Sequence, residues 1–136
     1  MLASRDRAQQ LGLKARGIVR SYAVAALEPR SFAVAPVPAV RLALERAGLA
    51  LKDIDLIEIN EAFAAQMLAV IRDLGLDRSR VNIYGGAVAL GHPTGMSGAR
   101  MVFQLLYELE ETGGRYGIAT LCGNGGPGAA LVLERI

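Results

Sequence analysis

The spacing of apolar residues changes several times along the chain, and each change predicts a different element. Apolar residues recur at helical spacing from Val37 through Val40 to Leu44, and Gly48 ends that predicted helix. Runs rich in β-branched and small residues predict strands at 17–27, 54–59, 81–84, 115–121 and 129–134. Further helices are predicted at 2–12, 61–74 and 97–111.

The predicted core elements follow the order β-α-β-α-β-α-β-β, which indicates an α/β fold in three layers. Alternating strands and helices favour a parallel sheet with helices on both of its faces. The loop 122–128 is too short for a crossover, so the last two strands should pair antiparallel and make the five-stranded sheet mixed. No linker or repeat interrupts the chain, which predicts one domain over 1–136: a leading segment at 1–16 and a core at 17–136.

The predicted helix at 61–74 is apolar on nearly every side. Only four of its residues are polar: Glu61, Gln66, Arg72 and Asp73. A helix of this kind is expected to be buried on nearly every side, so it should pack against another domain or subunit. If left exposed it would form a large apolar patch, which favours a homo-oligomer such as a twofold pair.

Composition excludes several classes of protein. Hydrophobic residues make up 52% of the 136 residues and charged residues 21%, as in globular proteins. The net charge is only +2, the basic residues are scattered and Trp is absent, so nucleic-acid binding is not expected. Neither a secretory signal core nor a membrane-length apolar run is found, and we expect a cytoplasmic protein without a membrane partner. A single cysteine excludes an intrachain disulfide, and one cysteine with one histidine disfavours a structural zinc site.

Three chemically capable residues come just after predicted strands: Asn60, His92 and Cys122. The carboxyl ends of parallel strands are where α/β folds tend to bind ligands, so the three should share a pocket. Histidine can take a proton from a thiol, cysteine can move a proton, and asparagine can hold a water. These types suit acyl or carbanion chemistry, or a cysteine hydrolase in which Cys122 is the nucleophile, His92 its base and Asn60 its orienter.

Each of these residues also has a structural interpretation. Asn60 could cap the helix that follows it, His92 could bond a backbone carbonyl, and Cys122 could be a small buried hydrophobe. The glycines around His92 and Cys122, in 85–98 and 122–128, favour the catalytic interpretation. Backbone N–H groups in such loops can approach a ligand closely and stabilise an oxyanion.

Five segments resemble the C-terminal half of the thiolases, the acetyl-CoA acetyltransferases and 3-ketoacyl-CoA thiolases. They are PVPAVRLALERAGL at 36–49, DIDLIEINEAF at 53–63, NEAFAAQ at 60–66, GGAVALGHPTGMSGAR at 85–100 and YGIATLCGNGGPGAALVLE at 116–134. The resemblance implies two similar α/β halves in five layers, with one helix of each half buried between the sheets. Such a position would account for the apolar helix 61–74. A cysteine at 122, where related ketoacyl synthases have histidine, favours a thiolase.

The resemblance also implies residue roles. His92 would deprotonate a nucleophilic cysteine and help form one oxyanion hole, and Asn60 would hold the water of that hole. Cys122 would be the acid/base, and the backbone N–H of Asn124 would serve the other hole. The acyl pocket would be lined by Phe63, Gly91 and Gly125. Acyl-CoA and CoA would be the substrates, with no resident cofactor or metal.

Two departures from the family pattern qualify this resemblance. The nucleophilic cysteine of thiolases lies in their N-terminal half, and this chain has only Cys122. We therefore expect the N-terminal domain to be absent and the chain to be inactive alone, unless a partner half supplies the thiol. A non-catalytic assembly or binding domain is the alternative. In addition, Asn124 stands where the family usually has glycine; if that position has a positive φ, asparagine is the least costly substitute.

Overall fold

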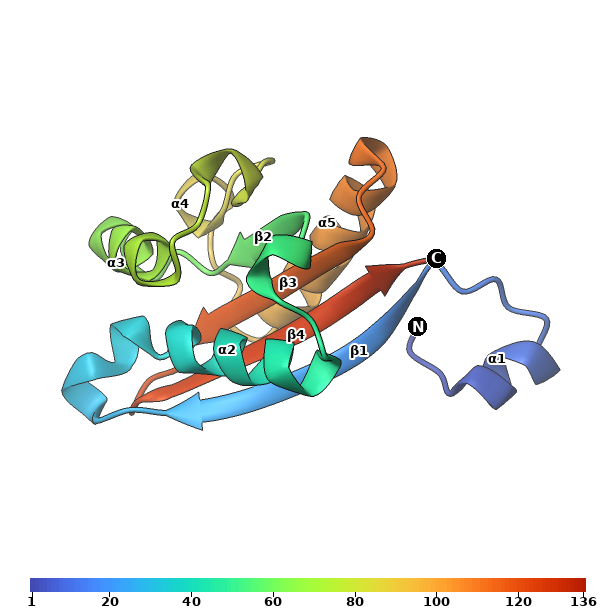
Figure 1. Cartoon of the computed structure of the whole chain (residues 1–136), viewed down its shortest axis with the longest axis horizontal. Coiled ribbons are helices and arrows are strands. Elements are labelled where there is room, and N and C mark those ends of the chain that lie inside the picture. The colour runs from blue at the N-terminus through green and yellow to red at the C-terminus, as the bar shows by residue number, and fades with distance from the viewer.

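The computed structural model describes all residues, 1–136, and shows an α/β fold (Figure 1). Its helices and strands follow the predicted order with ends shifted by a few residues, except that the strand expected at 81–84 is missing and α4 was not predicted. The elements are α1 (Arg5–Gln10), β1 (Gly17–Ala26), α2 (Pro36–Ala47), β2 (Leu56–Ile59), α3 (Ala64–Leu74), α4 (Ala87–Leu90), α5 (Ser97–Thr112), β3 (Tyr116–Cys122) and β4 (Pro127–Arg135). Short 3-10 turns lie at Pro29–Val34, Leu51–Asp53 and Arg78–Arg80.

The sheet has four strands in the order β1-β4-β3-β2. Strands β2 and β3 are parallel, whereas β4 is antiparallel to both β3 and β1. The predicted antiparallel pairing of the last two strands is therefore confirmed. Since β1, β2 and β3 run in the same direction, their carboxyl ends share one edge of the sheet. We call this edge the carboxyl edge.

The prediction of a fifth strand at 81–84 is wrong. Only Val81 pairs with the sheet, through a single parallel bridge to Ile57. The next residue, Asn82, has a φ of 49°, which ends any extended conformation. Its side-chain amide accepts a hydrogen bond from the Ile59 N–H (2.8 Å) and donates one to the Ile59 carbonyl (2.9 Å). A side chain thus satisfies the backbone groups that another strand residue would have paired.

Helices cover both faces of the sheet, as predicted. In Figure 1, α2 crosses the front of the sheet and α5 lies behind it. Successive side chains of a strand point to opposite faces of the sheet, so the hydrophobic core has two parts. Ile57 and Ile59 pack with α2 and α3 on one face, and Leu56 packs with α5 on the other. The leading segment stands apart from this core, and α1 buries none of its residues.

Helix α3 is less buried than the sequence suggests. Only Gln66, Met67 and Val70 are buried, and Leu68 is 56% exposed. Exposed apolar side chains also lie on the opposite side of the sheet, where α5 exposes Phe103 and Tyr107 one turn apart. On β1 the exposed Tyr22 and Val24 face this side, since Ala23 between them belongs to the core under α2. A register shift between Val19 and Ser21 brings the exposed Val19 to the same side. We call the exposed residues of α5 and β1 together the α5-side surface.

Candidate functional site

Asn60 lies at the carboxyl edge, directly after β2. Its N–H donates to the carbonyl of Thr120 (3.0 Å), so the pairing of β2 with β3 continues through Asn60. This places Asn60 level with the end of β3, where Cys122 is the last residue. Helix α3 begins only at Ala64 and its N-cap residue is Phe63. The interpretation of Asn60 as a helix cap is therefore wrong.

The side chain of Asn60 is buried without a partner for its oxygen. The residue is 3% exposed, and Oδ1 has no hydrogen-bond donor within the chain. Leaving a buried polar atom unpaired costs about 1–3 kcal/mol. An unpaired buried acceptor at the carboxyl edge marks a place for a donor from outside the chain, such as a water molecule.

His92 lies on the exposed turn between α4 and α5. Its Nδ1 is 2.7 Å from the Oγ of Ser97, and that hydroxyl donates to the carbonyl of Pro93 (3.1 Å). A hydroxyl has one proton, so while Ser97 donates to Pro93 it can only accept from Nδ1–H. In the neutral imidazole Nε2 then has the free lone pair. This geometry leaves Nε2 able to act as a base.

Cys122 ends β3 and is half-buried. Burial raises the pKa of its thiol above the ordinary value, which favours the protonated form. The turn that presents His92 approaches the same strand end, because a Cβ added to Gly98 would lie 3.8 Å from Cδ2 of Leu121. The two side chains nevertheless make no hydrogen bond to each other, so the chain contains no Cys–His dyad.

The loop after Cys122 accommodates Asn124 without backbone strain. Positive φ angles occur at Gly125 (89°) and Gly126 (110°), but not at Asn124. Asn124 therefore does not occupy a position with the positive φ that would favour glycine, and asparagine is tolerated there without backbone strain. Gly126 is the residue that must lack a side chain, since a Cβ there would overlap the carbonyl oxygen of Leu27.

The three residues expected to line an acyl pocket are open to solvent in this chain. Phe63 is 62% exposed. An added Cβ would meet no atom within 4 Å at Gly91 or at Gly125, and both have a positive φ. The chain alone thus provides at most one wall of such a pocket.

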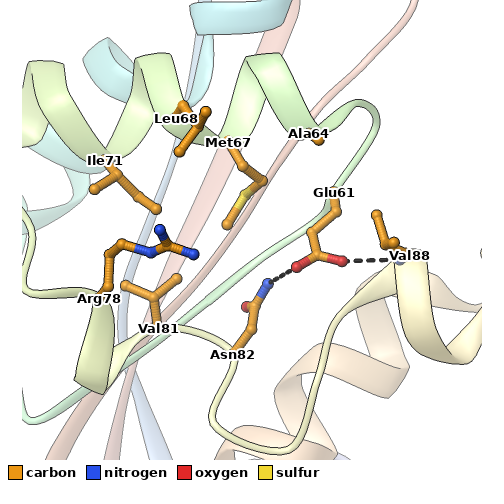
Figure 2. Close-up of a pocket in the computed structure, with 9 residues that line it drawn as sticks. All are labelled: Glu61, Ala64, Met67, Leu68, Ile71, Arg78, Val81, Asn82 and Val88. Carbon is orange, nitrogen blue, oxygen red and sulfur yellow. Dashed lines mark hydrogen bonds between the residues drawn. The ribbon is translucent and has the colours of Figure 1, made fainter.

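Sequence reasoning missed a hydrogen-bonded group beside the site. Glu61 links Asn82 to the N–H of Val88 (Figure 2). These residues form one end of a groove of about 510 Å³ between α3, the turn at Arg78–Arg80 and α4. Glu61 directly follows the candidate residue Asn60, but Asn82 lies inside the predicted strand 81–84, so no local pattern marked the two as partners.

A second missed group is buried under α5. Glu58 of β2 is fully buried and receives a hydrogen bond from Gln104, which also donates to Glu108 (both 3.2 Å). Burial, together with the nearby Glu108 carboxyl, raises the pKa of Glu58 to about 9. Arg100 is 3.9 Å from Glu58 and partly opposes this shift. No sequence pattern marks the group, because Glu58 occupies an ordinary polar position within a short strand.

No helix of the chain combines the length and the apolar character needed to cross a bilayer. No three side chains among His, Cys, Asp and Glu are grouped so that they could hold a metal ion.

Comparison with known proteins places this arrangement in a family. Residues 13–135 match the family described as thiolase, C-terminal domain. The chain is 51% identical to an acetyl-CoA acetyltransferase of Syntrophomonas wolfei, over the whole chain and 35% of that protein. It is also 51% identical to a beta-ketoadipyl-CoA thiolase of Pseudomonas knackmussii, over the whole chain and 34% of that protein.

Solved structures agree with the sequence comparison. A crystal structure of human mitochondrial 3-ketoacyl-CoA thiolase in complex with CoA superposes with a TM-score of 0.96 at 44% identity, over 98% of this chain and 34% of that one. A Bacillus anthracis acetyl-CoA acetyltransferase gives 0.95 at 46% identity, over the same shares. The chain spans about a third of the length of these relatives. It belongs to the thiolase family and corresponds to the C-terminal domain of its members.

Proposed function

We propose that the chain provides the C-terminal half of a thiolase-type active site, which transfers acyl groups between 3-ketoacyl-CoA and CoA. The observation that carries the proposal is the 2.7 Å contact between Nδ1 of His92 and the Ser97 hydroxyl, because it engages Nδ1 and leaves Nε2 without a partner in the chain. The printed names of the relatives, acetyl-CoA acetyltransferase and thiolase, support the same chemistry.

In the proposed reaction, Nε2 of His92 takes the proton of a cysteine thiol that lies outside this sequence. The thiolate attacks the 3-keto carbon, the bond between C2 and C3 breaks, and an acyl-enzyme forms. The departing acetyl-CoA enolate takes a proton from the Cys122 thiol. The thiol of a second CoA then gives its proton to the Cys122 thiolate and attacks the acyl-enzyme, which releases acyl-CoA. The nucleophilic cysteine leaves as a thiolate and takes back the proton held by His92. The reverse sequence is a Claisen condensation.

The state of Cys122 supports its role as an acid. A raised pKa keeps the thiol protonated at neutral pH, as a proton donor to an enolate must be. A nucleophilic cysteine needs the opposite shift and an adjacent base. The stand-alone cysteine hydrolase is therefore the weaker hypothesis.

Two further groups would stabilise oxyanions. The unpaired Oδ1 of Asn60 suits an ordered water, which could donate its other hydrogen to a thioester oxygen. The N–H of Asn124, in the open loop after Cys122, would serve the second oxyanion. Phe63, Gly91 and Gly125 would line the acyl pocket once a partner half closes it.

The partner in this proposal is a thiolase N-terminal half, and its docking site is the α5-side surface. Phe103 and Tyr107 of α5 are each about half exposed, and Tyr22 of β1 is 70% exposed on the same side of the sheet. Large apolar and aromatic side chains grouped in this way favour a protein interface. In the absence of the partner half, the same surface would favour pairing of two copies of the chain.

A chimera tests the proposed function. This chain would replace the C-terminal third of the Syntrophomonas wolfei acetyl-CoA acetyltransferase, and thiolysis of acetoacetyl-CoA would be measured. The chimera should be active, and His92→Ala should lower kcat by roughly 10²–10⁴-fold. A folded chimera that is inactive, or one that His92→Ala leaves fully active, would instead support the non-catalytic assembly domain.

A further inference from the structure

The side chain of Glu61 joins the two segments that present Asn60 and His92. Glu61 directly follows Asn60 in the chain. Its Oε1 accepts a hydrogen bond from Nδ2 of Asn82 (3.1 Å), and its Oε2 accepts one from the N–H of Val88 (2.8 Å). In Figure 2 the carboxylate lies between these two partners, at one end of the groove.

The bond to Val88 acts on the element that leads into His92. Helix α4 is a single turn that ends at Leu90, so only Gly91 separates it from His92. Its N-cap residue, Gly86, has no side chain to accept a hydrogen bond from the first turn. The Glu61 carboxylate provides that acceptor from a different part of the chain.

The hydrogen bond from Asn82 connects Glu61 to the segment that presents Asn60. The same Asn82 amide bonds both backbone groups of Ile59, the residue before Asn60. The Asn82 side chain is therefore bonded to both neighbours of Asn60, the backbone of Ile59 and the carboxylate of Glu61. Two hydrogen bonds to different partners, one on each carboxylate oxygen, restrict rotation of the Glu61 side chain.

Close packing restrains the carboxylate further. A Cβ on Gly86 would overlap the carboxyl carbon of Glu61 and lie 2.6 Å from Nδ2 of Asn82. The backbone of Gly86 itself is extended (φ −107°), a conformation that any residue adopts. Glycine is needed at this position because the carboxylate is there, not because of backbone strain.

We propose that Glu61 is a positioning residue that fixes the placement of His92 relative to Asn60. The catalytic meaning of that placement rests on the proposed function, whereas the placement itself can be measured without any activity. Glu61 is not a catalytic residue in this proposal, because it acts on His92 through α4.

The test uses the fact that His92 is the only histidine. Its ring nitrogens can be observed by NMR in histidine-labelled chain without ambiguity. The wild type should show one sharp set of signals with Nδ1 protonated. Glu61→Ala should shift both nitrogens toward the values of free histidine and broaden them, and Glu61→Gln, which keeps one acceptor oxygen, should lie between the two.

Two matched variants control the test. Glu45→Ala removes an exposed carboxylate of α2 whose side chain forms no hydrogen bond or ion pair, and it should leave the His92 signals unchanged. Gly86→Ala keeps every charge but displaces the Glu61 carboxylate, so it should reproduce the effect of Glu61→Ala. Circular dichroism would verify that each variant is folded.

The proposal is overturned if Glu61→Ala lowers only the melting temperature and leaves the His92 signals at their wild-type positions. It is also overturned if Gly86→Ala moves the His92 signals while Glu61→Ala does not. In the active chimera, Glu61→Ala should lower kcat more than it raises KM for CoA. An inactive wild-type chimera would count against the proposed function without changing the NMR result.

Discussion

The Nδ1 atom of His92 lies 2.7 Å from the hydroxyl of Ser97, the first residue of α5. The turn between them is closed by N–H groups of Met96 and Ser97, which both donate to the carbonyl of Pro93. That carbonyl also accepts from the Ser97 hydroxyl. One short segment thus holds the imidazole, and the donation from Ser97 to Pro93 favours the tautomer with a proton on Nδ1.

Ser97→Ala should free the imidazole while leaving the fold intact. Without the hydroxyl, Nδ1 has no acceptor in the chain, so the tautomer with a free Nε2 lone pair loses its preference. In the chimera we expect kcat to fall by about tenfold, which is less than the effect of His92→Ala. Ser31→Ala, which removes a hydroxyl without a hydrogen bond, is the control. Equal kcat values for the two serine variants would contradict the assignment.

Glu58→Gln should flatten the pH dependence of stability. The folded chain holds the Glu58 proton up to a pKa of about 9, whereas the unfolded chain releases it near 4.5. The folded state binds more protons between these values, so the free energy of unfolding should fall as pH rises through this window. The slope is at most about 1.4 kcal/mol per pH unit for one proton. In the variant the side chain at position 58 is neutral at every pH in this window, so the free energy of unfolding should change less steeply with pH.

Thermal unfolding of the wild type and of Glu58→Gln between pH 5 and pH 9 measures this effect. Burial also raises the pKa of Glu108, so some slope should remain in Glu58→Gln. Glu111→Gln, at the exposed end of α5, provides the control and should keep the wild-type slope. Parallel curves for wild type and Glu58→Gln would mean that Glu58 is ionised in the folded chain.

Gly128→Ala should destabilise the chain through a direct clash. Its φ is not positive, but a Cβ would overlap the backbone carbonyl of Ala35, next to α2. Because backbone must move to relieve this contact, we expect a loss of at least about 2 kcal/mol in urea unfolding. Gly95→Ala adds a Cβ that meets nothing within 4 Å, so it should change stability by less than about 0.5 kcal/mol. Similar losses in the two variants would refute the clash.

Cys122 should react slowly with thiol reagents. Its raised pKa lowers the thiolate fraction, and thiolate is the reactive form. At pH 8 the folded chain should react with a disulfide reagent more slowly than the same chain in urea. Cys122→Ser should not react, because the chain has no other cysteine. A faster reaction in the folded chain would favour the hypothesis that the chain is a cysteine hydrolase with Cys122 as its nucleophile.

Phe103→Ser should weaken binding of an N-terminal thiolase half. The side chain is 51% exposed, so its loss should hardly change the stability of the chain alone. At an interface, the same loss should raise the dissociation constant by about tenfold or more, as measured by sedimentation. Leu68→Ser removes a comparably exposed side chain from α3. A larger effect of Leu68→Ser would place the interface on α3, the helix that the hydrophobic pattern favours.

The sequence by itself determined the order of the four sheet strands and the three longer helices along the chain, the mixed sheet, the helices on both faces and the family. These features depend on local signals. The spacing of apolar residues predicts α2, and Gly48 marks its end. The loop between β3 and β4 is too short for a crossover, so these strands must pair antiparallel. The three candidate residues could also be found, because each follows a segment that the pattern predicts as a strand.

Only the tertiary structure decided how those residues are held. Asn82 ends the expected fifth strand because its side chain finds Ile59, 23 residues away, and such a contact leaves no local pattern. Glu61 and Val88 likewise meet across 27 residues, and Glu58 is buried by a helix that comes much later in the chain. Apolar spacing shows which side of an element avoids water, but long-range packing decides which partner covers it and which polar groups are buried with it.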